Sequence, residues 1–211
     1  MINLLLVLFA ATLLFVSVTS RLEAYIKVLF LQGLIVFIMV TLESPVLNSF
    51  NFLFLALETL GFKTIIIPLI LVRVIRKLDI RREVEPYTLH FHSLAIATLL
   101  LIFGFVIAFV SIKPGQALKP LHFAVSIATI LIGLFIIMSR KKIITHILGF
   151  IIIENGIFML SLSIAGEMPF IVNLGVLLDI FIGIFLLVVV LNRIHSTFDE
   201  AHIDELTNLT D

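Results

Sequence analysis

The stretch that decides the fold is Ile143–Ile194, which reads IITHILGFIIIENGIFMLSLSIAGEMPFIVNLGVLLDIFIGIFLLVVVLNRI. It predicts two apolar helical spans, and each span carries one acidic residue near its middle, Glu154 in the first and Asp179 in the second. An ionised side chain at the centre of a bilayer costs about 2.5–3.5 kcal/mol on insertion scales. Acidic residues at this depth therefore predict a functional site.

The composition of the whole chain indicates a polytopic helical membrane protein. Of its 211 residues, 61% are hydrophobic and only 13% are charged, which excludes a soluble domain. The formal net charge is zero, and the sequence has no basic face or stripe of the kind that binds nucleic acid. It contains no cysteine, so this chain can form no disulfide and no cysteine-ligated zinc or iron–sulfur site.

Seven apolar segments are long enough to cross the roughly 30 Å hydrocarbon core as α-helices. Continuous apolar runs without alternation favour helices over a β-barrel. The N-terminal residues lack the basic region and cleavage site of a signal peptide, so we expect them to form the first span. The predicted spans are Ile2–Thr19, Ala24–Leu42, Phe52–Ile75, Leu89–Ile112, Leu121–Ser139, Ile143–Ile164 and Phe170–Ile194.

The distribution of lysine and arginine predicts the orientation of the spans. Most basic residues gather at alternate connections, namely Arg21, Arg73, Arg76, Lys77, Arg81, Arg82, Arg140, Lys141, Lys142 and Arg193. The opposite connections contain only two, Lys113 and Lys119. Because basic loops stay in the cytoplasm, we expect the N-terminus outside and the C-terminal tail, Ser196–Asp211, in the cytoplasm.

The first three spans align with the last three. A shift of about 122 residues places Gln32 on Glu154, and a shift of 121 places Glu58 on Asp179. Apolar sequences align with one another easily, so duplication and chance similarity both stay open. Under duplication the chain has a 3+1+3 arrangement of spans. Its units are a three-helix unit at 1–76, a linker with the fourth span at 77–120, a second three-helix unit at 121–195 and a tail at 196–211.

Glu154 and Asp179 are the first candidates for proton transfer. Rise along the two helices puts both near the midplane, and the short Ala165–Pro169 connection predicts an antiparallel hairpin, which allows both carboxylates to face the same interhelical space. Two neighbouring carboxylates titrate as a coupled pair, as a proton relay requires. The alternative is that each is a protonated or hydrogen-bonded residue that holds helices together.

Glu58 and Lys63 place two further charged residues in the third span. Residues five apart lie about 140° apart on an ideal α-helix, so these two share a face only where the helix is distorted. Pro68 is a source of distortion, because it removes the backbone hydrogen bond to Thr64. The pair predicts either a charge-coupled axis together with the other carboxylates or a static ion pair.

Three further polar residues lie in apolar spans. Gln32 and Asn155 either hydrogen-bond between helices or hold water between charges. His146 lies eight residues before Glu154 on the same side of the helix, and it either passes protons inward or is an interfacial residue without a role. Gly156, like Gly183 in the last span, is expected to allow close helix contact.

The sequence argues against an autonomous enzyme. His90, His92 and His122 have no acidic neighbours at the spacing of metal ligands. No nucleophile–base constellation, phosphate loop or facing pair of haem-binding histidines is present. We therefore expect no catalytic residue, no metal and no cofactor in this chain.

Two runs and the tail carry a family resemblance. The runs LGFIIIENGIFML at Leu148–Leu160 and LGVLLDIFIGI at Leu174–Ile184 resemble subunit K of respiratory complex I and the C component of Mrp-type cation/proton antiporters. The tail His202–Leu206, HIDEL, is also similar to that of the complex I subunit. With four additional N-terminal spans, the whole chain resembles the hydrogenase-4 component E family of formate hydrogenlyases and other group 4 membrane-bound hydrogenases.

The resemblance implies that Glu154 and Asp179 are the membrane acids of the last two spans. Asp replaces the family's Glu at 179 and is one methylene shorter, and the connection before it is shorter than in complex I. The implied function is proton translocation by a non-catalytic subunit in a prokaryotic cytoplasmic membrane. Implied partners are antiporter-like membrane subunits, a quinone-site-like membrane subunit and a peripheral arm with hydrogenase and iron–sulfur subunits. A component of a cation/proton antiporter and a purely structural assembly subunit are the alternatives.

Overall fold

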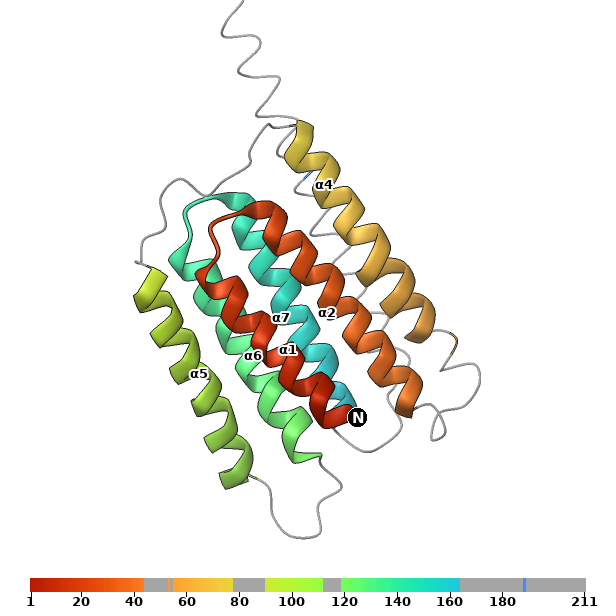
Figure 1. The fold of residues 1–211 in the computed structure, drawn as a ribbon, viewed down its shortest axis with the longest axis vertical. Helices are drawn as coiled ribbons and strands as arrows, with labels where there is room; N and C mark the ends of the chain where they lie inside the picture. The colour runs from red at the N-terminus through yellow and green to blue at the C-terminus, as the bar shows by residue number, and fades with distance from the viewer. Residues whose placement is uncertain (44–52, 54, 78–89, 112–118, 164–187, 189–211) are drawn as a thin grey trace, which may run out of the picture.

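The computed structural model describes residues 1–43, 53, 55–77, 90–111, 119–163 and 188, and they form an all-helical bundle (Figure 1). Four of the described helices are long and apolar enough to cross a membrane, and a fifth, the N-terminal one, is shorter. The prediction of an all-α polytopic membrane protein is therefore confirmed. The elements are α1 (Ile2–Val18), α2 (Leu22–Glu43), the π-helix η2 (Leu57–Ile66), α4 (Ile67–Lys77), α5 (His90–Ser111), α6 (Pro120–Ser139) and α7 (Ile143–Ser163).

The observed helices follow the predicted spans closely. α1, α2, α5, α6 and α7 begin and end within about two residues of the predicted bounds. The third span is divided into η2 and α4, which the apolar pattern does not reveal. The seventh predicted span, Phe170–Ile194, lies outside the described residues apart from position 188. The count of seven spans, the division into 3+1+3 units and the orientation stay predictions.

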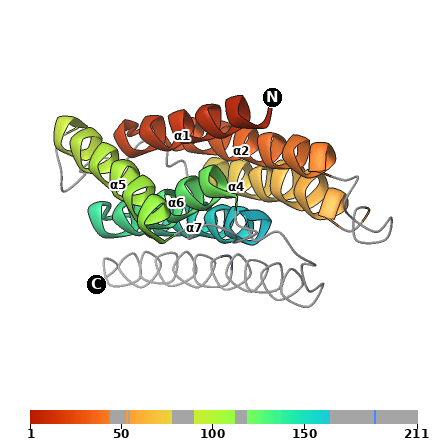
Figure 2. The same cartoon turned by 90° about the horizontal axis from the view of Figure 1, so that it is seen from below.

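Two helical hairpins form the centre of the bundle. α1 and α2 make one hairpin, α6 and α7 make the other, and α1 contacts α6 while α2 contacts α7. α5 packs on α6 and α1 at one edge, and η2 and α4 pack on α2 at the opposite edge (Figures 1 and 2). This arrangement brings the third predicted span next to the helix that carries Glu154.

A buried arginine joins the turns of the two hairpins. Arg140 follows α6 and donates hydrogen bonds from Nη2 to the carbonyl oxygens of Ser17, at 3.0 Å, and Thr19, at 3.1 Å. The last carbonyls of a helix lack intrahelical donors and carry partial negative charge, so a guanidinium satisfies both needs. The ring nitrogen Nε2 of His146 faces the carbonyl oxygen of Arg140 at 2.7 Å and donates to it. The two turns therefore lie at the same end of the bundle.

Close backbone contact fixes α7 against α6. A Cβ atom on Gly156 would lie 3.0 Å from the backbone nitrogen of Ile130 and 3.1 Å from the carbonyl oxygen of Ser126. Only glycine leaves room for helices to approach this closely. The expected packing role of Gly156 is confirmed, while Gly183 lies outside the described residues. α7 is thus held on one side by α6, and its other side is available to the polar residues described next.

Candidate functional site

The π-helix η2 brings Glu58 and Lys63 onto one face. Its backbone bonds join residues five apart, so that the N–H of Ile67 donates to the carbonyl oxygen of Phe62. Pro68 follows directly and has no N–H to extend an α-helical pattern back to Thr64. Residues five apart in a π-helix lie one turn above each other, and the Lys63 Nζ atom is 3.9 Å from the Glu58 Oε1 atom. η2 is therefore the helix distortion that places Glu58 and Lys63 on a shared face.

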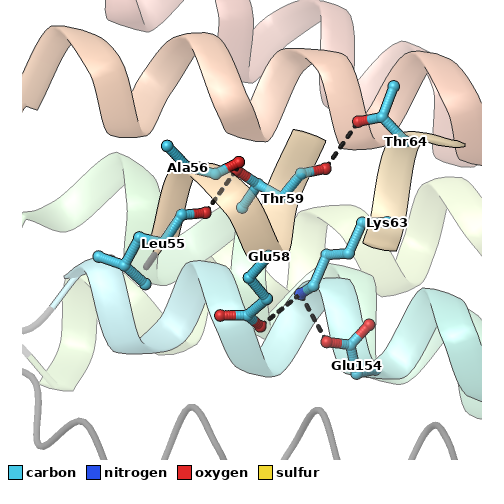
Figure 3. Close-up of polar contacts among 7 residues, drawn as sticks. All are labelled: Leu55, Ala56, Glu58, Thr59, Lys63, Thr64 and Glu154. Carbon is cyan, nitrogen blue, oxygen red and sulfur yellow. Dashed lines mark hydrogen bonds and ion pairs between the residues drawn. The ribbon is translucent and has the colours of Figure 1, made fainter. Parts of the chain in front are cut away.

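A threonine hydroxyl reinforces the wide turn. Thr64 Oγ1 donates to the carbonyl oxygen of Thr59, again five residues back, at 2.7 Å. Thr59 Oγ1 in turn donates to the carbonyl oxygen of Leu55 at 2.7 Å (Figure 3). Both hydroxyls are buried, so the segment satisfies its side-chain donors within its own backbone. This leaves the ion pairs as the polar contacts that η2 directs toward α7.

Lys63 lies between two glutamates from different helices (Figure 3). Its Nζ atom is 2.5 Å from the Glu154 Oε1 atom of α7, in addition to the longer contact with Glu58. The same ammonium lies 4.1 Å from the centre of the Phe158 ring, a cation–π distance. The three charged side chains are 3%, 1% and 4% exposed for Lys63, Glu58 and Glu154. We call these three residues the ion cluster.

The ion cluster contains more acceptors than donors. Glu58 Oε2 and Glu154 Oε2 are buried, and among the described residues neither accepts a hydrogen bond. The Oδ1 atom of Asn155, the residue next to Glu154, is also buried and accepts no hydrogen bond from a described residue. Buried acceptors without donors are rare in folded proteins and point to a proton, a water or an ion as the missing partner.

A chain of neutral hydrogen bonds runs from Asn155 to α1. Asn155 Nδ2 donates to Gln32 Oε1 at 3.2 Å, and Gln32 Nε2 donates to Thr12 Oγ1 at 2.9 Å. Thr12 Oγ1 passes the chain on to the carbonyl oxygen of Phe9 at 2.6 Å. Of the two interpretations of the amides, hydrogen bonding between helices is the one present here. Thr12 was not expected, because a single threonine in an apolar helix gives no distinctive pattern.

The structure brings four of the six predicted site residues into one region. Glu58, Lys63 and Glu154 form the ion cluster, and Gln32 reaches it through Asn155. His146 instead bonds Arg140 at the turn between α6 and α7. Asp179 lies outside the described residues. Within the described part of the chain no three His, Asp or Glu side chains cluster as a metal site. The proton-transfer role of all six stays a prediction.

The fold and the ion cluster define a class of protein: a helical membrane protein that holds a lysine and two glutamates in its interior. Comparison with known proteins narrows the class. Residues 121–211 match the family model for NADH-ubiquinone/plastoquinone oxidoreductase chain 4L. The match includes Glu154 and Asp179 but not Glu58 or Lys63, which come from the N-terminal part.

Comparison with individual proteins gives two further similarities. The chain is 28% identical over 117 residues to hydrogenase-4 component E of Escherichia coli K12, covering 56% of this chain and 54% of that protein. It is 27% identical over 193 residues to an uncharacterised protein of Mycobacterium tuberculosis, covering 90% of this chain and 87% of that protein. No solved structure matches. The resemblance to hydrogenase-4 component E and to the complex I subunit is confirmed, and it groups the chain with membrane subunits of complex I-like assemblies. The alignment spans about half the length of hydrogenase-4 component E.

Proposed function

We propose that this chain is a non-catalytic membrane subunit of a hydrogenase- or complex I-like respiratory complex, and that its buried carboxylates carry protons. One observation above all supports the proposal: Lys63 lies between Glu58 and Glu154, and all three charged side chains are buried. Charged residues inside a membrane protein are costly and mark proton or ion pathways. Three such residues in contact form a group whose proton number can change.

The same contacts suggest how a proton moves. Glu154 belongs to the part of the chain that matches chain 4L, and the ion cluster adds Glu58 and Lys63 beside it. In the proposed path Glu154 and Asp179 carry the proton between α7 and the last span, with Glu58 and Lys63 extending the polar axis toward α2. Gln32 holds α2 in place through its bond to Asn155. His146 serves as an entry point for protons only if its hydrogen bond to the carbonyl oxygen of Arg140 breaks.

The proposed partners follow from the similar proteins. Hydrogenase-4 component E is named as a component of a hydrogenase, and chain 4L as part of an oxidoreductase. We propose antiporter-like membrane subunits, a quinone-site-like membrane subunit and a peripheral arm with hydrogenase and iron–sulfur subunits. Electron-transfer cofactors belong to those partners. The proposed location is a prokaryotic cytoplasmic membrane, with the N-terminus outside and the C-terminus in the cytoplasm.

The test is proton pumping by the assembled complex in inverted membrane vesicles, normalised to the amount of complex. Glu154→Gln and Asp179→Asn each remove a proton-carrying group with little change in shape, and we expect pumping to fall at least about tenfold, since a relay step that loses its acid or base loses about two orders of magnitude. Thr98→Val is the matched control, because Thr98 is in α5 and donates to the carbonyl oxygen of Leu94 in its own helix. Normal pumping and normal assembly in both carboxyl variants would refute the proposal.

A structural role is the second candidate, and the close Lys63–Glu154 contact favours it. An ion pair that only holds helices together predicts that Glu154→Gln lowers the yield of complex while pumping per complex stays constant. The third alternative, a component of a cation/proton antiporter without a redox arm, rests on the resemblance to the Mrp-type C component. Neighbouring genes for hydrogenase subunits or for antiporter subunits separate it from the first.

A further inference from the structure

The three charges of the ion cluster do not cancel. Two carboxylates and one ammonium leave a net charge of −1 when both acids are ionised. Besides these three, Arg140 is the one other Lys, Arg, Asp or Glu buried among the described residues, and it is bonded to the turn carbonyls at the end of α1. An uncompensated charge in a low-dielectric interior is strongly disfavoured. One bound proton makes the ion cluster neutral.

The distances identify the carboxyl group that takes this proton. Glu154 Oε1 is 2.5 Å from the Lys63 Nζ atom, and an opposite charge this close favours the ionised carboxylate. Glu58 Oε1 is 3.9 Å from the same atom, so the same charge stabilises it less. No oxygen of either carboxyl group accepts a hydrogen bond from a described residue, so these two distances distinguish Glu58 from Glu154. Glu58 is therefore the carboxylate with the least to stabilise its charge.

We infer that the ion cluster is a one-proton site in which the proton rests on Glu58 beside the Lys63–Glu154 ion pair, and that it accepts H⁺ but not Na⁺. This inference rests on the proposed function and names the ion. On loading, a Glu58 oxygen forms an O–H bond with a proton from hydronium, which leaves as water. On release, the O–H bond breaks and a water takes the proton. Neither bond change involves Lys63.

Lys63 is the residue that excludes Na⁺. A hard cation needs several oxygen ligands in direct contact, and here the two carboxylates would supply them. The position between these carboxylates is already filled by an ammonium that is covalently attached to η2 and covered by the Phe158 ring. Sodium would have to displace Lys63 or lie in contact with a like charge. A proton adds to one oxygen and needs no such space.

The π-helix sets the spacing on which the inference depends. On an α-helix Glu58 would point about 140° away from Lys63 and would not belong to the same charge group. In η2 the two share a face, close enough for their charges to interact and too far apart for a direct bond. Lys63 therefore forms its close bond across the helix interface with Glu154, and Glu58 stays available for a proton.

Infrared spectroscopy of the full-length chain in lipid nanodiscs tests the proton count. A protonated carboxyl group gives a carbonyl stretch that shifts in D₂O. An ionised carboxylate lacks this band. Charge balance predicts that Glu58→Gln removes one protonated carboxyl group from the wild-type spectrum. It also predicts that Glu154→Gln removes one, because Glu58 and Lys63 then balance each other, and that Lys63→Met adds one. Glu23→Gln is the control, since Glu23 is an acidic residue in the first turn of α2, outside the ion cluster.

Each outcome decides for or against the inference. If Glu58→Gln removes no band from the wild-type spectrum, the inference is overturned. Retention of the Glu58 band in Glu154→Gln also overturns it. If Glu58→Gln does not fold, Glu58→Asp must shift the frequency of the band, and an unshifted band overturns the assignment to Glu58. Replacing choline chloride with NaCl must leave the wild-type band unchanged, whereas loss of the band in NaCl would refute the exclusion of Na⁺.

The result is separable from the test of the proposed function. If the band is present but the Glu58→Gln complex pumps normally, the proton site exists without serving transport, and the proposed function fails at Glu58. If pumping depends on Glu58 and Glu154 but no protonated band is found, the function stands and the one-proton assignment fails. Infrared spectra and pumping rates therefore report on the two proposals independently.

Discussion

Lys63 and Arg140 are both buried cations, and their partners differ in kind. Lys63 as a whole residue is 5% exposed and faces the carboxylates of Glu58 and Glu154 from η2. Arg140 is 3% exposed and donates to backbone carbonyls at the end of α1. Carbonyl oxygens do not titrate at any ordinary pH, whereas carboxylates do. The partners of Arg140 therefore keep the same charge, whereas the two carboxyl groups that face Lys63 can each be protonated or ionised.

This difference separates a cation with a structural role, Arg140, from a cation whose partners can change their charge, Lys63. A guanidinium stays protonated in proteins and matches several acceptors in a fixed plane, which suits a joint between two helix turns. An ammonium is a compact point charge on a flexible stem, which suits a position between two acids of unequal distance. The N-terminal half of this chain thus supplies a counter-ion, Lys63, to the carboxyl group of the chain 4L-like region.

The largest expected effect is that of Lys63→Met on stability. Removing one partner of a buried ion pair costs about 3–5 kcal/mol, because the charge that is left has no compensation. We expect a loss of this size in the free energy of unfolding of the purified chain in detergent. The double variant Lys63→Met with Glu154→Gln also removes the carboxylate that has lost its counter-ion, while Glu58 is already protonated, and we expect it to recover most of the loss. A single variant as stable as the wild type would contradict the compensation of Glu154 by Lys63.

Arg140→Met comes next and distinguishes the two cations. It removes two hydrogen bonds from a charged donor, each of which contributes about 1.5–3 kcal/mol in general, and part of the loss is recovered when water reaches the exposed carbonyls. We expect a net loss of about 2 kcal/mol in the same unfolding measurement, with Arg140→Lys intermediate. Proton pumping per assembled complex should not change. If pumping fell while stability did not, Arg140 would belong to the proton path and the distinction would fail.

The sequence predicts the helices well because the apolar runs are long and contain few charged residues. It also indicates the condition under which Glu58 and Lys63 share a face, a distorted helix, and η2 meets that condition. A π-helix itself could not be predicted, since its five-residue hydrogen bonds leave no distinct period in a sequence that is apolar all round. The partner of Lys63 on α7 could not be predicted either, because the facing of two helices depends on their packing.

Burial of basic residues at the helix ends was also beyond the sequence. Arg140 stands with Lys141 and Lys142 in a basic run that predicts orientation, and nothing in the run shows that Arg140 alone turns inward. The repeat alignment placed Gln32 on Glu154, but the hydrogen bond joins Gln32 to the next residue, Asn155. An alignment records similar positions, and a contact depends on which side of each helix faces the other.

Two glycines of the same helix pair allow a matched test of how η2 is held. A Cβ atom on Gly33 of α2 would lie 2.7 Å from Thr64 Oγ1 and 3.1 Å from its backbone nitrogen. Gly33→Ala therefore pushes against the hydroxyl that bonds Thr59, and overpacking of this kind costs about 1–3 kcal/mol. Gly61→Ala is the control, since a Cβ there meets nothing within 4 Å. We expect Gly33→Ala to lower the thermal midpoint of the purified chain and to raise the number of protonated carboxyl groups in its infrared spectrum, with Gly61→Ala near the wild type. Equal effects would show that close packing on Thr64 does not hold Lys63 in place.

The smallest expected effect concerns the neutral bond between Gln32 and Asn155. Hydrogen bonds between membrane helices contribute about 0.6 kcal/mol on average in double-mutant cycles. We expect a coupling of this size between Gln32→Leu and Asn155→Leu in the free energy of unfolding, and no effect of Gln32→Leu on pumping. Asn155 is adjacent to Glu154, so its amide is a neutral group through which a charge change in the ion cluster can reach α2 and Thr12. A coupling above about 2 kcal/mol, beyond the range measured for such bonds, or a loss of pumping in Gln32→Leu, would mean that the charge-sensitive region extends from Lys63 to α1. The hydrogen-bond chain from Asn155 through Gln32 to Thr12 would then belong to the same site as Lys63, and Arg140 alone would have a purely structural role.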